Sequence, residues 1–319
     1  MLFERNALQP VSADSALKRT ANAVGIALIA EFVLFNTLFS IPYNFAYLLY
    51  PDEQSLGFEI AGSLCASLMY VLSLCIPFFV FRLAMRGSPK RNPEFTLRGN
   101  VGLLLLIPAV AGLSDGLVII DSELSWYFLS AAPGASFRPE AVMIILDFIY
   151  VVLVPAFFEE LFFRGCILEN LLPYGKINAL LVSATVFALF HGNFNQFLYT
   201  FGAGLLIGAA YVLYKSIWPG IIIHLCYNLL AVAEEYVLGM EGISNVLYSL
   251  IDAARTAGGL LFILLFALYA KKHKFPGTLT DAPGETGVNA YGRNLFTPVI
   301  ITYAVLVLVG AVYDSIFSV

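Results

Sequence analysis

Nine long apolar runs, separated by short polar segments, dominate the sequence. A helix of ~20 apolar residues spans the ~30 Å hydrocarbon core of a bilayer, because it rises by ~1.5 Å per residue. The fifth and eighth runs are short, so we expect eight or nine membrane-spanning helices. The runs are residues Ala21–Ile41, Phe58–Phe81, Val101–Ile120, Ala141–Phe163, Ile177–Phe190, Gln196–Tyr214, Trp218–Leu238, Thr256–Ala270 and Thr297–Tyr313.

Charged residues are scarce in this chain. They make up 12% of the sequence, whereas hydrophobic residues make up 60%, and the mean hydropathy is +0.83. A soluble domain usually carries about 25% charged residues. These values predict an all-α, polytopic integral membrane protein that has the lipid bilayer as a partner, and we expect no nucleic acid partner.

Lysine and arginine are distributed unevenly between the two sides of the predicted bundle. If the N-terminus is cytoplasmic, 15 of the 17 fall in cytoplasmic segments, with Arg164 among them, and only Arg138 and Arg255 lie outside. Positively charged segments near helix ends favour the cytoplasmic side. We therefore expect a cytoplasmic N-terminus and, with nine spans, an external C-terminus. Short loops favour a prokaryotic plasma membrane.

The domain organisation follows from one break in the hydrophobic pattern. Residues 1–274 are expected to form a helical membrane domain, with a motif-bearing core at about 141–230. Residues 275–294 are rich in proline and glycine and are expected to form a flexible cytoplasmic linker. Residues 295–319 are then expected to form an accessory membrane helix at the C-terminal end.

Three short polar patterns lie inside the apolar runs. Adjacent carboxylates precede an arginine in the first, and the other two each contain a histidine with a partner four residues away. Ionisable groups at depth in a bilayer cost several kcal/mol on typical insertion scales, so they indicate a functional site. The residues of the three patterns are Glu159, Glu160 and Arg164, then Phe187 and His191, then His224 and Asn228.

The helical repeat separates the two carboxylates. Residues four apart share a helix face, whereas neighbours diverge by about 100°. Glu160 is therefore expected to pair with Arg164 and to hold the end of its span, which leaves Glu159 free to accept a proton. His224 and Asn228 project from one face as hydrogen-bonding groups.

This set of groups is suited to peptide-bond hydrolysis within a helix bundle. Phe187 lies one turn from His191 and is expected to fix its ring. A carboxylate and a histidine can activate water, opposite a histidine and an asparagine that hold a developing oxyanion. The sequence has no evident Ser-His or Cys-His nucleophile pair, so we expect direct attack by water.

In their order and spacing, the three patterns resemble the CAAX protease and bacteriocin-processing family, which includes the type II CAAX prenyl endopeptidases. The family pattern is Glu-Glu-x-x-x-Arg, then Phe-x-x-x-His, then His-x-x-x-Asn. The resemblance covers roughly Ala141 to Leu230.

The resemblance implies a glutamate-dependent intramembrane endopeptidase with an all-helical fold. In that interpretation, Glu159 and His191 activate the water, and His224 with Asn228 stabilises the oxyanion. The substrate is then a peptide or protein in the membrane, with a prenylated tail as one possibility, and no cofactor or metal is required.

Two other functions remain open at this point. Glutamate and histidine also bind zinc, which leaves a metal-dependent intramembrane protease, although the usual His-Glu-x-x-His helix motif is absent. The same polar residues also suit a non-enzymatic membrane scaffold, an immunity-type protein or a peptide transporter that binds a peptide or a proton.

The predicted spans place the histidine of the second pattern at the wrong depth. Glu159 lies ~8 Å from Arg164 along its helix. If the fifth span begins at Lys176, His191 lies ~22 Å from Lys176 along that span, near the other side of the membrane. We therefore expect the segment from Gly165 to about Leu181 to run partly along the membrane interface, so that the next helix starts later.

Other acidic residues in or near the apolar runs are not assigned to the site. Glu234 and Glu235 lie near the outer end of the seventh run and are expected to be solvated at the interface. Three further acidic residues lie within apolar runs, namely Glu31, Asp115 and Asp147. Each can face a helix partner, an interface or an ion path.

Overall fold

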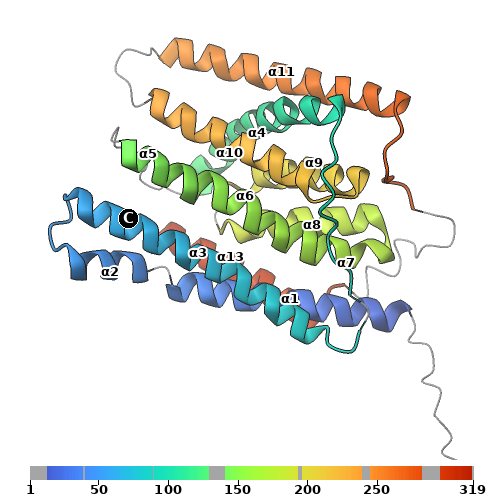
Figure 1. Cartoon of the computed structure of the whole chain (residues 1–319), viewed down its shortest axis with the longest axis horizontal. Coiled ribbons are helices and arrows are strands. Elements are labelled where there is room, and N and C mark those ends of the chain that lie inside the picture. Colours follow the sequence, from blue (N-terminus) through green and yellow to red (C-terminus); the bar gives the residue numbers. More distant parts are fainter. Residues whose placement is uncertain are drawn as a thin grey trace, which may run out of the picture.

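The computed structural model describes residues 13–38, 40–88, 90–128, 141–192, 196–238, 245–281 and 295–317. Every regular element in these ranges is a helix, which confirms the all-α prediction. The helices run broadly along one direction, with α11 and α4 on one side of the bundle and α1, α2 and α13 on the other (Figure 1). The elements that carry the three polar patterns lie between these two sides.

The first three helices form a connected unit. α1 covers Ala13–Leu38, α2 covers Ile41–Leu49 and α3 covers Leu56–Ala84, and both α1 and α2 pack against α3. Ser55 caps α3, because its side chain accepts a hydrogen bond from the backbone N–H of Phe58. This unit forms one wall beside the motif-bearing core.

The fourth apolar run belongs to a helix of 34 residues, Ala141–Tyr174, that changes its winding along its length. It comprises α5 (Ala141–Asp147), η1 (Phe148–Leu153), α6 (Val154–Glu159), η2 (Glu160–Leu168), α7 (Glu169–Leu171) and η3 (Leu172–Tyr174). The segments η1 and η2 are π-helical, and η3 is a 3-10 turn. π-helical turns are rare and occur frequently at functional sites. Here the junction of α6 and η2 falls between the two adjacent glutamates.

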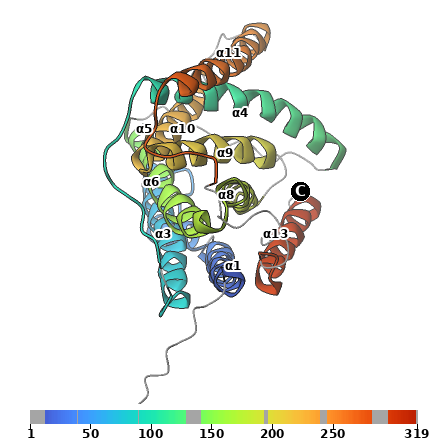
Figure 2. The ribbon, with the colours of Figure 1, turned by 90° about the vertical axis from the view of Figure 1, so that its right-hand side faces the viewer.

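α8, which covers Lys176–Phe190, lies in the middle of the bundle (Figure 2). α9 (Phe197–Tyr214) and α10 (Trp218–Leu238) follow it in the chain, and α13 (Pro298–Phe317) packs against α1 and α8. Figure 2 shows α8 surrounded by α6, α9, α1 and α13. The pattern-bearing residues of α8 are thereby kept inside the bundle.

Two glycines set the packing of the outermost helices. α4 (Val101–Phe128) lies against α11 (Asn245–Lys272), and a Cβ atom added to Gly112 would lie 2.6 Å from the Cα atom of Gly259. Only residues without side chains allow two helix backbones to approach this closely. The close approach fixes α11 on the outer face of the bundle.

Six helical stretches are long and apolar enough to cross a membrane, judged by length and composition among the described residues. The predicted fifth, seventh and ninth spans coincide with apolar helices that are shorter, namely Lys176–Phe190, Trp218–Glu234 and Pro298–Tyr313. Leu260, Leu261 and Leu264 on α11 are each more than half exposed, as expected for side chains in contact with lipid. The protein is therefore an integral membrane protein with at least six candidate spans.

The predicted end of the fourth span is wrong, and so is the expected interfacial course of Gly165 to Leu181. The helix continues through Arg164, whose side chain is completely buried rather than cytoplasmic, and ends at Tyr174. The chain turns at Gly175, where φ is +133°, and α8 begins at once. Glu159 and His191 are therefore equally far from this turn in sequence, which removes the predicted mismatch in depth.

Basic segments from distant parts of the chain meet at one end of the bundle. Arg19 donates a hydrogen bond to the carbonyl of Arg86 at 3.0 Å, and Arg98 donates to the carbonyls of Tyr214 and Lys215, each at 3.0 Å. The ends of α3 and α11 and the starts of α1 and α8 lie at this same end (Figure 1). The charge asymmetry that the sequence predicts is thus present as a single basic face.

Part of the predicted linker is packed onto this face. Gly277 donates its backbone N–H to the carbonyl of Leu213 at 2.8 Å, and Lys176 bonds both to Asp281 through its backbone N–H at 2.7 Å and to the carbonyl of Thr280 through its side chain at 2.8 Å. Residues 275–281 therefore follow a defined path over α8 and α9. Residues 282–294 lie outside the described part of the chain.

Two predictions are corrected at the opposite side of the bundle. Glu234 is predicted to be solvated, but it has a protein partner. Arg255 is predicted to lie outside the spans, but it lies within a helix. Arg255 on α11 pairs with Asp115 on α4 at 2.9 Å and with Glu234 on α10 at 2.5 Å. Asp147 accepts a hydrogen bond from the hydroxyl of Tyr236 at 2.7 Å. These contacts join neighbouring helices away from the three patterns, and the side chain of Glu235 lies outside the described part.

Candidate active site

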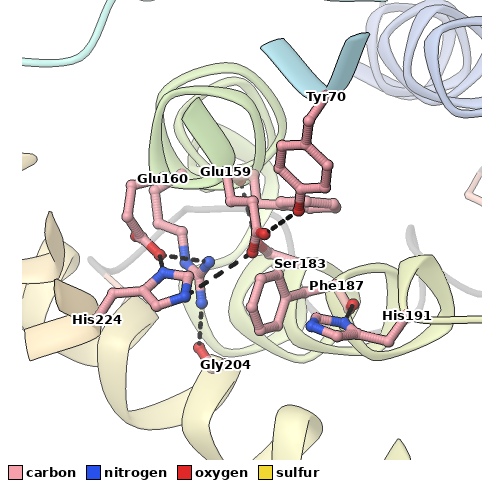
Figure 3. Close-up of polar contacts among 10 residues, drawn as sticks. Tyr70, Glu159, Glu160, Ser183, Phe187, His191, Gly204 and His224 are labelled. Carbon is pink, nitrogen blue, oxygen red and sulfur yellow. Dashed lines mark hydrogen bonds and ion pairs between the residues drawn. The ribbon is translucent and has the colours of Figure 1, made fainter. Parts of the chain in front are cut away.

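Glu159 and His224 face each other across the interface between α6 and α10 (Figure 3). Both are buried, with 3% and 5% of their surfaces exposed. The Nε2 atom of His224 lies 3.9 Å from the Oε2 atom of Glu159, which is too long for a direct hydrogen bond. The first and third sequence patterns therefore meet, as predicted, and leave a short gap between their polar atoms.

Glu160 connects the first pattern to the third through a second contact. Its Oε1 atom accepts a hydrogen bond from Nη1 of Arg164 at 2.8 Å, which is the predicted i,i+4 ion pair. The same oxygen lies 3.0 Å from Nδ1 of His224. A carboxylate is an acceptor, so Nδ1 of His224 is the protonated nitrogen of this contact. Glu160 thus fixes the histidine ring so that Nε2 points toward Glu159.

Arg164 is completely buried and is held by three groups. Besides its pair with Glu160, its Nη2 atom donates a hydrogen bond to the carbonyl of Gly204 on α9 at 3.2 Å. Its guanidinium carbon lies 4.5 Å from the centre of the Phe187 ring. A buried cation requires such a partner set, because an unpaired charge in an apolar interior is strongly destabilising. The arginine therefore ties the long helix to α8 and α9.

A glycine on α10 allows the carboxylate of Glu160 to approach that helix. A Cβ atom added to Gly220 would lie 2.8 Å from Oε2 of Glu160 and 3.3 Å from Ile207. Any larger residue at this position displaces the carboxylate or its helix. Gly220 is therefore part of the support of the site.

Tyr70 on α3 is a further residue of the site, which the sequence patterns did not reveal. Its hydroxyl donates a short hydrogen bond to Oε1 of Glu159. The other carboxylate oxygen, Oε2, is buried and has no hydrogen-bond partner among the described residues. Glu159 is thus oriented through one oxygen, and the other remains available.

His191 ends α8 and lies on the other side of Phe187 from His224 (Figure 3). The Phe187 ring centre is 5.0 Å from that of His191 and 6.0 Å from that of His224, in edge-to-face geometry. Nδ1 of His191 lies 2.9 Å from the carbonyl oxygen of Phe187. A carbonyl only accepts hydrogen bonds, so Nδ1 carries the proton, and Nε2 has no hydrogen-bond partner among the described residues.

No direct hydrogen bond joins Glu159 and His191 among the described residues. The described bonds of Glu159 lead to α3, and those of His191 stay within its own helix. Any joint action of these two groups therefore requires an intervening molecule such as water. The predicted polar break after His191 continues into residues 193–195, which lie outside the described part.

Asn228 lies one turn beyond His224 on α10 and contacts the π-helical segment η1. Its Nδ2 atom donates a hydrogen bond to the carbonyl of Val151 at 3.0 Å. A side-chain amide has two N–H groups, so this bond leaves a second donor. The irregular winding of η1 thus provides a backbone acceptor that the sequence did not predict.

An aromatic cavity reaches the site from the side of α1, α2 and α3. Its volume is about 280 Å³, and Tyr70 forms part of its wall together with Tyr43, Met69 and Tyr150. The hydroxyl of Tyr70 is bonded to Glu159, so the cavity ends one side chain away from the carboxylate. Such an arrangement offers an apolar approach to a polar centre.

Metal-ligand geometry is not found in the described part of the chain. No group of three or more histidine, cysteine, aspartate or glutamate side chains there is arranged to hold a metal ion. Glu159 accepts a hydrogen bond from Tyr70, and Glu160 pairs with Arg164 and with His224.

Comparison with known proteins agrees with the interpretation of the motifs. Residues 141–230 match the family model described as type II CAAX prenyl endopeptidase Rce1-like. The matched segment contains all three polar patterns, so the resemblance inferred from them is confirmed, and it indicates a CAAX-type protease that acts in the membrane. Searches of curated proteins and of solved structures gave no significant match.

Proposed function

We propose, from the premise that residues 141–230 are similar to the type II CAAX prenyl endopeptidases, that the protein is a glutamate-dependent intramembrane endopeptidase. The observation that carries the proposal is the state of Glu159. One of its oxygens is bonded to Tyr70, and the other is buried, has no hydrogen-bond partner among the described residues and faces His224 at 3.9 Å. A carboxylate held in this way is suited to binding and deprotonating a water molecule.

In the proposed reaction, Oε2 of Glu159 accepts a proton from water. The water oxygen bonds to the carbonyl carbon of the peptide, and the carbonyl oxygen becomes negatively charged. The proton then passes from Glu159 to the leaving nitrogen as the C–N bond breaks, which yields a carboxylic acid and an amine and restores the carboxylate of Glu159. His191 is proposed to hold the same water through Nε2, because its Nδ1 is engaged by the carbonyl of Phe187.

His224 and Asn228 are proposed to stabilise the negatively charged oxygen. Glu160 engages Nδ1 of His224, so Nε2 must carry a proton for His224 to act as a donor. Asn228 uses one amide N–H for Val151 and retains the second for the oxyanion. Donors of this kind are typically worth about 10²- to 10³-fold each in rate.

Glu160, Arg164 and Phe187 are proposed to support the site rather than to react. Glu160 and Arg164 have no exposed surface, and their contacts with His224, Gly204 and Phe187 leave them no path to a substrate. Phe187 separates the two histidine rings and contacts both. This rigid centre keeps the reacting groups at a fixed spacing.

The substrate is proposed to be a peptide or protein segment in the membrane. A segment that carries a lipid-modified tail, such as a prenyl group, is one of the two classes of substrate to test. The aromatic cavity of about 280 Å³ beside Tyr70 supports an apolar ligand. An apolar transmembrane segment and a prenyl chain would both suit such a cavity, and a cleavage assay with the two classes of substrate distinguishes them.

We also propose that the basic face is cytoplasmic, in a prokaryotic plasma membrane, with the N-terminus on the same side. The meeting of Arg19, Arg86, Arg98 and Lys215 at one end of the bundle supports this orientation. Accessibility of a cysteine introduced next to Lys215 to a membrane-impermeant reagent, in intact cells and in inverted vesicles, tests it.

The test of the proposed function compares purified wild type with Glu159→Gln and Glu159→Asp. Glutamine has the same shape but cannot accept the proton, so Glu159→Gln should lose turnover while the fold is retained. Activity that survives metal removal supports direct glutamate chemistry, and activity that is lost and returns on metal addition supports the metal-dependent alternative. A biological effect that persists in Glu159→Gln supports the non-enzymatic alternative.

A further inference from the structure

A second cavity opens beside His191, between α1, α8 and α13. Its volume is about 190 Å³, and its wall includes Glu31 from α1, His191 and Gly192 from the end of α8, and Tyr303 from α13. The three helices that enclose it are neighbours in the bundle (Figure 2). The C-terminal helix, which the sequence patterns leave without a role, thus forms one side of a chamber next to the candidate site.

Glu31 has no hydrogen-bond or ion-pair partner among the described residues, although only 3% of its surface is exposed. It shares the cavity wall with His191 of the candidate site. The hydroxyl of Tyr303 is also buried and lacks a hydrogen-bond partner in the described part of the chain. Buried polar groups are normally satisfied, so the unbonded hydroxyl of Tyr303, on the same cavity wall as the carboxyl group of Glu31, indicates a missing polar ligand.

The cavity has the dimensions of a single side chain. Sites for drug-sized molecules usually measure about 300–1,000 Å³, so 190 Å³ is too small for them. Phe32, Phe35 and Phe190 supply apolar walls, against which the aliphatic part of a long side chain can pack. The chamber therefore fits a side chain with an apolar stem and a polar end.

The charges around the cavity favour a cation. Among the described residues that line the cavity, Glu31 is the one acidic residue, and none is a lysine or an arginine. Arg164 is already paired with Glu160 and does not line this cavity, so it does not supply a cation to Glu31. An acidic side chain would add a like charge beside Glu31, and a purely apolar side chain would give the carboxyl group of Glu31 no hydrogen-bond partner.

We propose that this cavity is a side-chain subsite that accepts a lysine or arginine of the substrate next to the scissile bond, with Glu31 as the residue that selects it. The hydroxyl of Tyr303 accepts a further hydrogen bond from the same cation. This inference rests on the proposed endopeptidase function, because a subsite beside His191 requires a peptide bound across Glu159.

A positional peptide library tests the selection. Each position is occupied in turn by lysine, arginine, glutamine, leucine or glutamate, and cleavage by the purified full chain is followed by mass spectrometry. Wild type should cleave the lysine or arginine peptides with a kcat/KM about 10- to 100-fold higher than the glutamine peptide at one position next to the cut. Glu31→Gln should reduce this ratio to about 1, and Glu31→Lys should favour glutamate.

Two variants complete the library experiment. Val33 is 53% exposed on the same helix, so Val33→Ala should retain the wild-type ratio. Tyr303→Phe should lower the ratio by less than Glu31→Gln does. An unchanged ratio in Glu31→Gln, with Glu159→Gln inactive, would overturn the subsite and leave the proposed function intact.

A binding measurement without proteolysis separates the two proposals. The cation n-butylammonium has the size and charge of a lysine side chain, and n-butanol is its neutral counterpart. The first should raise the thermal unfolding midpoint of wild type more than the second, and Glu31→Gln should abolish this difference. Equal shifts by the two ligands in wild type would overturn the subsite, including in the case that Glu31→Gln fails to fold.

Discussion

The hydroxyl of Tyr70 on α3 is bonded to one carboxylate oxygen of Glu159 on α6, and the second oxygen of Glu159 is left unbonded among the described residues. This relationship divides the carboxylate into an oriented oxygen and a reactive one. It also makes α3 part of the site, although the three sequence patterns lie on other helices.

Removal of the tyrosine hydroxyl should therefore slow catalysis without unfolding the protein. A hydrogen bond to a charged group contributes about 1.5–3 kcal/mol, so Tyr70→Phe should lower kcat by about 10- to 100-fold. Tyr236→Phe is the matched control, with activity near that of wild type, because it removes a hydrogen bond of 2.7 Å to another carboxylate, that of Asp147. Equal kcat in Tyr70→Phe and wild type would show that Glu159 needs no such orientation.

Loss of the buried arginine should cost stability as well as activity. Arg164→Leu leaves the carboxylate of Glu160 buried with only His224 as a partner, so we expect a loss of about 3–5 kcal/mol in the free energy of unfolding. The double variant with Glu160→Leu should recover much of this loss but remain inactive, because His224 loses its orienting acceptor. Denaturant or thermal unfolding in detergent, together with the cleavage rate, measures both effects.

A single added methyl group should perturb the site from the α10 side. Gly220→Ala places a carbon 2.8 Å from Oε2 of Glu160, so Glu160 and the ring of His224 must shift. A misplacement of this size costs up to about 100-fold in rate. Gly258 on α11 has no heavy atom within 4 Å of the added carbon. Gly258→Ala should therefore leave the rate unchanged and raise stability by at most about 1 kcal/mol.

The ion-pair cluster on the opposite side of the bundle should affect stability alone. Arg255 joins Asp115 and Glu234 from two other helices, and Arg255→Leu leaves both carboxylates without it. We expect a loss of about 1–3 kcal/mol in stability and a normal rate per folded molecule. Arg255→Lys keeps the charge but not the planar guanidinium group, so its stability should lie between that of wild type and that of Arg255→Leu. A lower cleavage rate per folded molecule in Arg255→Leu would show that this cluster is coupled to the site.

The sequence predicts the ends of a helix well where the helix coincides with an uninterrupted apolar run. α10 begins and ends at the predicted residues Trp218 and Leu238, and α8 differs by one residue at its start. The prediction fails at Arg164, because a charged residue is a good marker of a span end only when water is its partner. Here Glu160 and Gly204 replace water, so the helix continues to Tyr174.

The candidate residues could be selected from the sequence, and their catalytic roles stay predictions, but the contacts between them could not be predicted. The spacing of four residues correctly predicts the pair of Glu160 and Arg164, since that contact is made within one helix. The contact of Glu160 with His224 and that of Tyr70 with Glu159 depend on how separate helices are placed, and no local pattern contains this information. One tyrosine among the 17 in the chain has no distinguishing neighbours in sequence.

The central claim is that Glu159 activates water for peptide hydrolysis, and mass spectrometry of the cleaved peptides tests it most directly. Purified wild type and Glu159→Gln, shown to have the same thermal unfolding midpoint, are incubated in bilayer discs with the same mixture of membrane-associated peptides. The account predicts defined pairs of fragments with wild type and none with Glu159→Gln. The same fragments at the same rate from both proteins would contradict it.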